Sequence, residues 1–195
     1  SDASGWLATF ELHEDLRSDA RATVQALLDQ NMTVRLLSGD GADAVSRVAS
    51  AVGIVDFQGG CSPQDKLAFL KAAQERGARV AVVGDGLNDG PALAGAHVSF
   101  SFGQAVPLAQ AQSDFVVLGE QLSTVVATVR LARRTLRVVR QNLVWAGVYN
   151  AVCVPLAVLG YLPAWLAGLG MALSSLLVVL NALRLSAHAD LEGVS

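Results

Sequence analysis

The stretch VAVVGDGLNDGPAL at residues 80–93 decides the fold that we predict for this chain. Its four leading apolar residues are typical of a buried strand in a parallel sheet. The glycines allow a tight turn, and Asn88 and Asp89 are placed to cap a short helix that begins near Pro91. The pattern predicts the carboxylates of Asp85 and Asp89 at the carboxyl end of a strand, where open α/β sheets place their chemistry. A Gly-Asp-Gly run also forms ordinary turns, so the stretch alone leaves both interpretations open.

The charged residues are unevenly distributed along the chain. They make up 16% of the 195 residues, and none of them lies in the 43 residues from 141 to 183. The first 140 residues, by contrast, have the charge density of a soluble protein. We therefore predict two parts, a soluble α/β unit and a membrane hairpin.

Composition narrows the class of protein further. A net charge of −3, without a basic stripe interleaved with aromatic residues, gives no indication of a nucleic-acid partner. Cys61 and Cys153 have no metal-like spacing, so neither a disulfide nor a zinc site is predicted. The chain starts without Met and without a signal peptide, and we expect it to be the carboxyl-terminal piece of a longer protein.

Strands and helices alternate along the soluble part with short loops between them. The predicted strands are 6–12, 33–40, 54–55, 80–83, 97–102 and 115–118, and the predicted helices begin at Asp15 or Ser18 and cover 43–52, 62–76 and 91–95. Such alternation is typical of a doubly wound, mostly parallel sheet. Its loops can bring Ser38 and Asp40, Lys66, and the loop of Asp85 to one pocket.

The last third of the chain is predicted to be a basic helix followed by two membrane-spanning helices. The helix at 123–141 carries five arginines, which mark the cytoplasmic side when they precede an apolar span. The segments 143–159 and 165–183 each approach the ~20 residues that a spanning helix needs, with a turn at 160–163. A buried soluble hairpin is the alternative interpretation. The predicted parts are 1–120, 121–141, 142–185 and a cytoplasmic tail at 186–195.

The predicted pocket suits phosphoryl chemistry. Asp85 offers Mg²⁺ the carboxylate oxygen that this cation prefers. Lys66 can offset charge on a transferring phosphoryl group, and Ser38 can donate a hydrogen bond to it. A solvated lysine and a helix cap are the ordinary interpretations of Lys66 and Asp40, and the residues alone do not exclude them.

Three motifs together resemble the later half of the phosphorylation domain of P-type ATPases, which has a haloacid-dehalogenase-like fold. They are Ser38-Gly39-Asp40, Pro63-x-x-Lys66 and GDGLNDGPAL at 84–93, in the order and at the spacing of that family. The family more often has Thr where Ser38 stands, and Ser retains the hydroxyl. The resemblance implies an incomplete domain of this fold followed by a transmembrane hairpin.

The membrane part narrows the resemblance. Tyr149-Asn150 and Met171-x-x-Ser174-Ser175 are similar to the copper(I)-exporting members of the heavy-metal branch. His97-Val98-Ser99 and Ser-Asp-Phe-Val at 113–116 resemble the subgroup that supplies copper for cytochrome oxidase assembly.

The resemblance implies roles for the residues of the soluble part. Asp85 and Asp89 would hold Mg²⁺ in the loop that Gly84 and Gly86 shape, and Asn88 would help to organise it. Lys66 would contact the aspartyl phosphate, and Ser38 and Asp40 would complete its cradle during hydrolysis.

The resemblance also implies a copper(I) site formed by Tyr149, Asn150, Met171 and Ser175. Thioether is a soft ligand of the kind that selects Cu(I), and Ser175 lies one turn from Met171 on the same helix face. Packing is the ordinary role of Met and Ser in a membrane helix. Cys153, one turn after Tyr149, could face the same cavity and bind Cu(I) as a thiolate, but we interpret it as a packing residue.

The sequence lacks the DKTGT loop with the acceptor aspartate, the TGE loop, the nucleotide-binding domain and the Cys-Pro-Cys ligands of the family. We therefore do not expect this chain alone to hydrolyse ATP. Our main hypothesis is part of an ATP-driven Cu(I) exporter of the plasma membrane, with the soluble part cytoplasmic. The expected cofactors are Mg²⁺ and ATP, and the expected partners are the metal ion, the lipid bilayer, the missing amino-terminal part and a copper chaperone. The alternatives are a non-enzymatic remnant and a membrane-tethered phosphatase, although we find no DxD loop for the latter.

Overall fold

The computed structural model describes residues 16–192, with only the backbone for Leu87 and for residues 186–192. The chain divides into two units, Ser1–Val126 and Ala127–Ser195. The strand predicted at 6–12 and the cap predicted at Asp15 lie outside the described residues.

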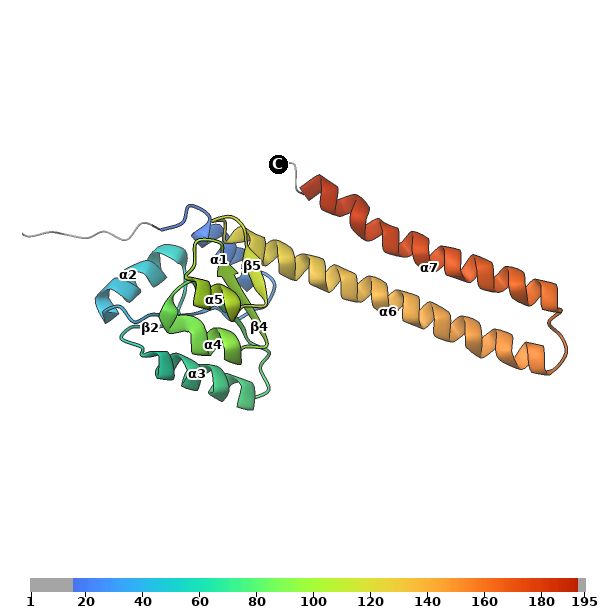
Figure 1. Ribbon diagram of the computed structural model, residues 1–195, viewed down its shortest axis with the longest axis horizontal. Helices are drawn as coiled ribbons and strands as arrows, with labels where there is room; N and C mark the ends of the chain where they lie inside the picture. The colour runs from blue at the N-terminus through green and yellow to red at the C-terminus, as the bar shows by residue number, and fades with distance from the viewer. Residues whose placement is uncertain (1–15, 193–195) are drawn as a thin grey trace, which may run out of the picture. The chain divides into compact units, whose positions relative to one another are not determined.

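The first unit alternates helices and strands, as Figure 1 shows. Its elements are α1 (Ala20–Leu28), β1 (Arg35–Leu37), α2 (Ala42–Val52), β2 (Asp56–Gln58), α3 (Pro63–Glu75), β3 (Ala81–Val83), a 3₁₀ turn (Leu87–Asp89), α4 (Gly90–Gly95), β4 (Val98–Phe102), α5 (Pro107–Ala111) and β5 (Phe115–Val117). The short helix α5 was not predicted from the sequence.

All strand pairs in the described part are parallel, but the strands form two sheets. β1 pairs with β2, and β3, β4 and β5 form a second sheet in that order. β1 and β3 are therefore edge strands of different sheets. The predicted mostly parallel α/β architecture is confirmed, in the incomplete form that the resemblance implied.

The end of α2 explains why one predicted strand is displaced. Gly53 adopts a left-handed conformation with φ 82° and ends the helix, as predicted. The N–H of the next residue, Ile54, donates to the Ala49 carbonyl at 2.8 Å. Because Ile54 still belongs to this cap, β2 forms at Asp56–Gln58, and the strand predicted at 54–55 is wrong.

The start of α1 also differs from the prediction. The helix begins at Ala20, and Asp19, not Ser18, occupies the cap position. The Asp19 side chain makes no cap hydrogen bond there, because its Oδ2 accepts from the Ser123 N–H at 2.8 Å. This carboxylate therefore joins the start of α1 to the start of the next long helix, 104 residues along the chain.

The core of the first unit is centred on β4, which is the most buried strand. Phe100 and Phe102 pack with Val117 and Val125 on one side of it. Alternate residues point to opposite faces of a strand, so Ser99 and Ser101 face the other side. Ser99 is 1% exposed and is fully hydrogen-bonded to Asp114. Asp114 Oδ2 accepts from the Ser99 N–H at 2.8 Å and from its hydroxyl at 3.0 Å, and the Asp114 N–H donates to that hydroxyl at 3.0 Å.

The second unit consists of two long helices, α6 (Ser123–Val158) and α7 (Ala164–Glu192). The first turn of α6 belongs to the first unit. The two helices run antiparallel and side by side in Figure 1. The two helices predicted at 123–141 and 143–159 are one continuous helix, because neither Gly nor Pro interrupts the junction between them. The turn predicted at 160–163 is confirmed, with Gly160 at φ 79°.

Both helices are long and apolar enough to cross a membrane, as judged by length and composition. The mean hydropathy of the most apolar window is 1.2 in α6 and 2.0 in Ala164–Leu185. Polar contacts join them: Trp145 Nε1 donates to Ser174 Oγ at 3.1 Å, and Asn181 Nδ2 donates to Asn142 Oδ1 at 2.9 Å.

Replacing Asp114 should destabilise the first unit. Asp114→Ala removes the acceptor of a buried N–H and hydroxyl, so we expect the free energy of unfolding to fall by about 1–3 kcal/mol. A denaturant titration of the full chain in detergent micelles, followed by circular dichroism, measures it. The exposed Glu75→Ala is the control and should change the value by less than about 0.5 kcal/mol. Equal effects of the two substitutions would contradict a structural role for Asp114.

Candidate functional site

The centre of the candidate site is an ion pair between Lys66 and Asp89. Lys66 lies in the first turn of α3, and its Nζ is 2.7 Å from Asp89 Oδ1. Both side chains are largely buried, at 14% and 20% exposure. Asp89 Oδ2 also accepts from the Gly86 N–H at 3.2 Å. Two of the predicted residues are thus brought together, and the pair joins α3 to the loop after β3.

The two glycines of the loop leave the space that Asp89 fills. A Cβ at Gly84 would lie 2.8 Å from Asp89 Cβ, and one at Gly86 would lie 3.3 Å from Asp89 Oδ2. Cβ contacts this short are essentially absent from real structures in the first case and unusually tight in the second. The predicted residues Gly84 and Gly86 therefore shape the loop by admitting the carboxylate against the backbone.

The prediction for the start of α4 is confirmed in position only, and for Asp89 but not for Asn88. Asp89 occupies the cap position, but its side chain makes no cap hydrogen bond because Lys66 and the Gly86 N–H use its oxygens. Asn88 lies in the 3₁₀ turn and is exposed. Within residues 16–192 its side chain has no hydrogen bond, so the organising role implied for Asn88 remains a prediction.

Asp85 contrasts with Asp89. Its carboxylate is 65% exposed, and Nη2 of the Arg17 guanidinium lies 4.0 Å from Asp85 Oδ2. Arg17 is held by stacking on Phe102, 4.1 Å from the ring centroid, and by donating to the Glu120 carbonyl. Our sequence reasoning missed Arg17, because a single arginine in a loop carries no periodic or motif signal.

Ser38 and Asp40 form a second pair at the carboxyl end of β1. The Ser38 hydroxyl donates to Asp40 Oδ2 at 2.6 Å. Their loop is joined to the next one, because the Cys61 N–H donates to the Ser38 carbonyl at 2.9 Å and the Gly60 N–H to the Asp40 carbonyl at 2.7 Å. Asp40 was an alternative candidate for the cap of α2, but Gly41 occupies that position.

The start of α3 connects the two pairs through the chain. Ser62, next to Cys61, accepts from the Asp65 N–H, and Asp65 accepts from the Ser62 N–H at 2.9 Å and hydroxyl at 2.7 Å. The hydrogen bond from the Ser62 side chain, followed by that from its backbone, lowers the pKa of Asp65. This capping box fixes the first turn of α3, which carries Lys66. Among the described residues, no hydrogen bond or ion pair directly joins Ser38 or Asp40 to Asp89.

The donor set fits a magnesium ion that is held partly by substrate. Within the described residues, no three His, Cys, Asp or Glu side chains gather as a metal site. Asp85 offers an exposed carboxylate, whereas Asp89 is already neutralised by Lys66. Mg²⁺ is typically bound by one or two carboxylates together with water and phosphate oxygens, so this sparse set is adequate for it.

Of the residues predicted to bind copper, Tyr149 lies in the contact between α6 and α7, and the others lie beside it. Tyr149 faces α7: its hydroxyl donates to the Ala167 carbonyl at 3.4 Å, and a Cβ at Gly170 would lie 2.9 Å from it. Met171, which is 65% exposed, and Ser175 are each one residue beyond the contact positions 170 and 174. One residue corresponds to about 100° around a helix. The site implied for Tyr149, Asn150, Met171 and Ser175 therefore remains a prediction.

Comparisons with known proteins agree with this arrangement. Residues 5–97 match the family model of haloacid dehalogenase-like hydrolases. The nitrogen fixation protein FixI of Bradyrhizobium diazoefficiens is 44% identical over 89% of this chain and 24% of its own length. The copper-exporting P-type ATPase of Staphylococcus epidermidis is 37% identical over 88% of this chain and 22% of its own length. A crystal structure of a zinc-transporting PIB-type ATPase in the E2.Pi state superposes with a TM-score of 0.82 and 31% identity, over 88% of this chain and 28% of that one.

The chain is homologous to heavy-metal P-type ATPases. The resemblance of its motifs to that family is thereby confirmed. The chain spans about a quarter of the length of these relatives. One of these relatives is a copper exporter by name and another a zinc transporter.

A double-mutant cycle on Lys66 and Asp89 should show strong coupling between them. In this P-type ATPase homologue, Lys66→Met leaves a largely buried carboxylate without a cation, so we expect a loss of about 1–3 kcal/mol in the free energy of unfolding. Lys66→Met combined with Asp89→Asn should recover part of that loss. Denaturant titration of the full chain in micelles provides the measurement.

The pair Arg35–Asp56 is the matched control, because its N–O distance is 2.8 Å but its side chains are 39% and 45% exposed. Its coupling should stay below about 1 kcal/mol. Coupling of Lys66 to Asp89 that is no stronger than in this control would show that the loop does not depend on the pair.

Proposed function

We propose that this chain is part of an ATP-driven transporter of heavy-metal cations, and that Cu(I) is the cation. In this proposal the chain supplies loops of a phosphoryl site and two membrane helices. The observation that supports the proposal is the difference between the two carboxylates of the loop at 84–90. Lys66 neutralises Asp89 at 2.7 Å, whereas Asp85 stays exposed. A purely structural turn has no need of an exposed carboxylate beside a buried ion pair.

The proposed mechanism assigns a step to each of the loops. Asp85 and Asp89 would hold Mg²⁺, which when bound neutralises charge on phosphoryl oxygens. The Lys66 ammonium would contact a phosphoryl oxygen, and its interaction with Asp89 would weaken as it does so. The Ser38 hydroxyl, which now donates to Asp40, would donate to the same phosphoryl group. The acceptor aspartate and the nucleotide site would come from outside these 195 residues, since the sequence contains no DKTGT loop.

The membrane placement follows from the two helices. We propose that α6 and α7 span the plasma membrane and that the arginines of α6 and the first unit are cytoplasmic. Of the relatives' cations, Cu(I) suits Met171 better than Zn²⁺ does, because thioether is a soft ligand. Supply of copper for cytochrome oxidase assembly and delivery by a copper chaperone remain narrower predictions from the subgroup motifs.

The alternatives differ in what the gene encodes before Ser1. A DKTGT loop and a Cys-Pro-Cys membrane segment upstream support the transporter. An initiation codon directly before Ser1 favours a non-enzymatic remnant, and a DxD loop favours a membrane-tethered phosphatase.

Asp85→Ala should abolish metal-stimulated ATP hydrolysis in the full-length protein. Removing a carboxylate that holds Mg²⁺ is expected to lower turnover by about 10²-fold or more. Phosphate release with Cu(I) present, measured on purified protein in lipid, tests this. Asp43→Ala, an exposed carboxylate in the first turn of α2, is the control and should retain turnover. Undiminished turnover of Asp85→Ala would refute the role given to Asp85.

Met171→Ala should remove a ligand from the membrane metal site. We expect the amount of Cu(I) bound per full-length protein to fall, while Zn²⁺ binding changes little, because only the soft cation gains from a thioether. Equilibrium dialysis followed by metal analysis gives both values. Leu173→Ala, an exposed apolar position two residues further along α7, should change neither. If Cu(I) binding is unchanged in Met171→Ala, Met171 is not a ligand.

A further inference from the structure

Six arginines and no acidic residue lie between Glu120 and Asp190. Five of them are on α6, and the sixth, Arg184, is on α7. The positive-inside rule accounts for cations at one end of a membrane hairpin. The rule does not explain why Arg137 and Arg140 line a groove on α6.

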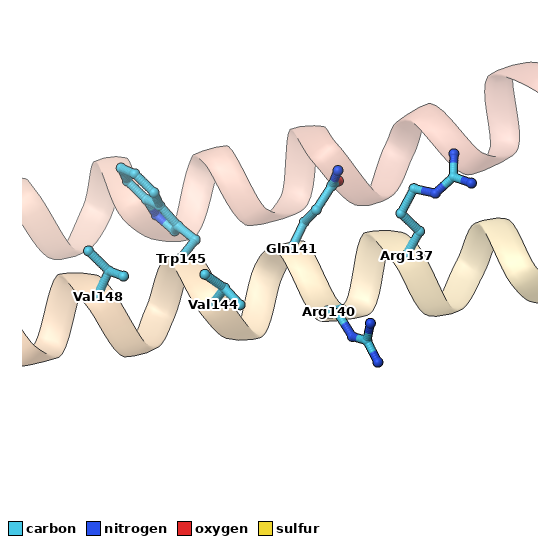
Figure 2. Close-up of a pocket in the computed structure, with 6 residues that line it drawn as sticks. All are labelled: Arg137, Arg140, Gln141, Val144, Trp145 and Val148. Carbon is cyan, nitrogen blue, oxygen red and sulfur yellow. The ribbon is translucent and has the colours of Figure 1, made fainter.

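The groove has a volume of about 410 Å³ and changes character along its length. Its lining residues are Arg137, Arg140, Gln141, Val144, Trp145 and Val148. Guanidinium and amide groups lie at one end, and valine and indole side chains lie at the other. Figure 2 shows Arg137 extending from α6 towards α7 and Arg140 extending to the opposite side of α6. Both residues line the polar end of the groove.

The groove is held in shape by contacts between the two helices. The indole of Trp145 is fixed by its hydrogen bond to Ser174 Oγ at 3.1 Å. Asn181 Nδ2 donates to Asn142 Oδ1 at 2.9 Å and contacts Gln141 Oε1 at 3.4 Å. In antiparallel helices this contact sets the level of Arg184, one turn after Asn181, close to the turn of α6 that carries Arg137 and Arg140.

The level of the groove in a membrane indicates what it would bind. Arg137 and Arg140 precede the uncharged stretch 141–183, whereas Val144 and Val148 lie inside it. In a bilayer the arginines would be at the level of the headgroups and the valines at the level of the acyl chains. Arginine presents a planar fork of N–H donors that matches phosphate.

We propose that this groove binds an anionic phospholipid of the cytoplasmic leaflet. The headgroup phosphate pairs with the arginines at the polar end of the groove, an acyl chain runs along Val144 and Val148, and Arg184 adds positive potential. An acidic protein segment could pair with the arginines, but it could not follow the apolar end of the groove into the membrane. The proposal rests on the membrane placement proposed above and is independent of the transported ion and of ATP hydrolysis.

Fluorescence quenching in vesicles tests the site with the whole chain. Trp6→Phe and Trp165→Phe leave Trp145 in the groove as the single tryptophan. The chain is reconstituted in phosphatidylcholine vesicles in which either the added phosphatidylglycerol or an equal fraction of the phosphatidylcholine carries brominated acyl chains. We expect brominated phosphatidylglycerol to be enriched about fivefold around Trp145, and Arg137→Gln with Arg140→Gln to reduce the enrichment to about unity.

The matched control is Arg130→Gln with Arg134→Gln, which removes the same two charges from α6 outside the groove. It should keep most of the enrichment. Equal loss in both double variants would indicate diffuse attraction and overturn the site, as would a lack of enrichment with all arginines present. Reversal of quenching by soluble glycerol phosphate or polyglutamate would identify another occupant and overturn the lipid assignment. If neither brominated lipid quenches the fluorescence of Trp145, the proposed membrane placement is contradicted.

Discussion

The ion pair between Lys66 and Asp89 is the interaction on which the candidate site depends. It crosses from the first turn of α3 to the loop after β3 and has little contact with solvent, so water does not replace either partner easily. Two glycines are needed for it, because a side chain at Gly84 would occupy the space of Asp89. The same pair explains why α4 starts without a side-chain cap. The start of α4 therefore lacks a stabilising cap, while the loop at 84–90 is fixed by the ion pair. Departures of this kind from local stability are expected at functional sites.

The fixed loop leaves Asp85 as the available carboxylate. Asp89 has a cation and an N–H donor, whereas the Asp85 carboxylate is mostly exposed and has, in the described part of the chain, a guanidinium at 4.0 Å. Two neighbouring acids therefore differ in what they can still bind. The Ser38–Asp40 pair is similar, since its hydroxyl is held by a partner that a phosphoryl oxygen could replace. In the proposed function these groups would supply hydrogen-bond donors and a carboxylate for Mg²⁺, and the nucleophile would come from outside these 195 residues.

The sequence allowed the parallel α/β class, the loop of residues 84–90 and the helical hairpin to be predicted, because each depends on local patterns. Errors occurred where a side chain or N–H serves a distant or neighbouring element. Asp19 resembles an ordinary cap but binds the N–H of Ser123, and Ile54 resembles a strand residue but completes the cap of α2. Arg17 approaches Asp85 while it stacks on Phe102 and donates to the Glu120 carbonyl, which are contacts between residues far apart in the sequence. No periodicity or motif carries information of this kind.

The packing of α6 on α7 also follows from helix periodicity. Gly170 and Ser174 are four residues apart and small, so they let α7 approach Tyr149 and Trp145 closely. Positions 171 and 175 must then point away from this contact. Asn150 and Ser175 are exposed polar side chains within the uncharged stretch, and polar groups at membrane depth almost always face other protein or a water-filled cavity. The hairpin therefore has polar side chains on a face that neither of its two helices covers. Such an arrangement is expected for two helices of a larger bundle.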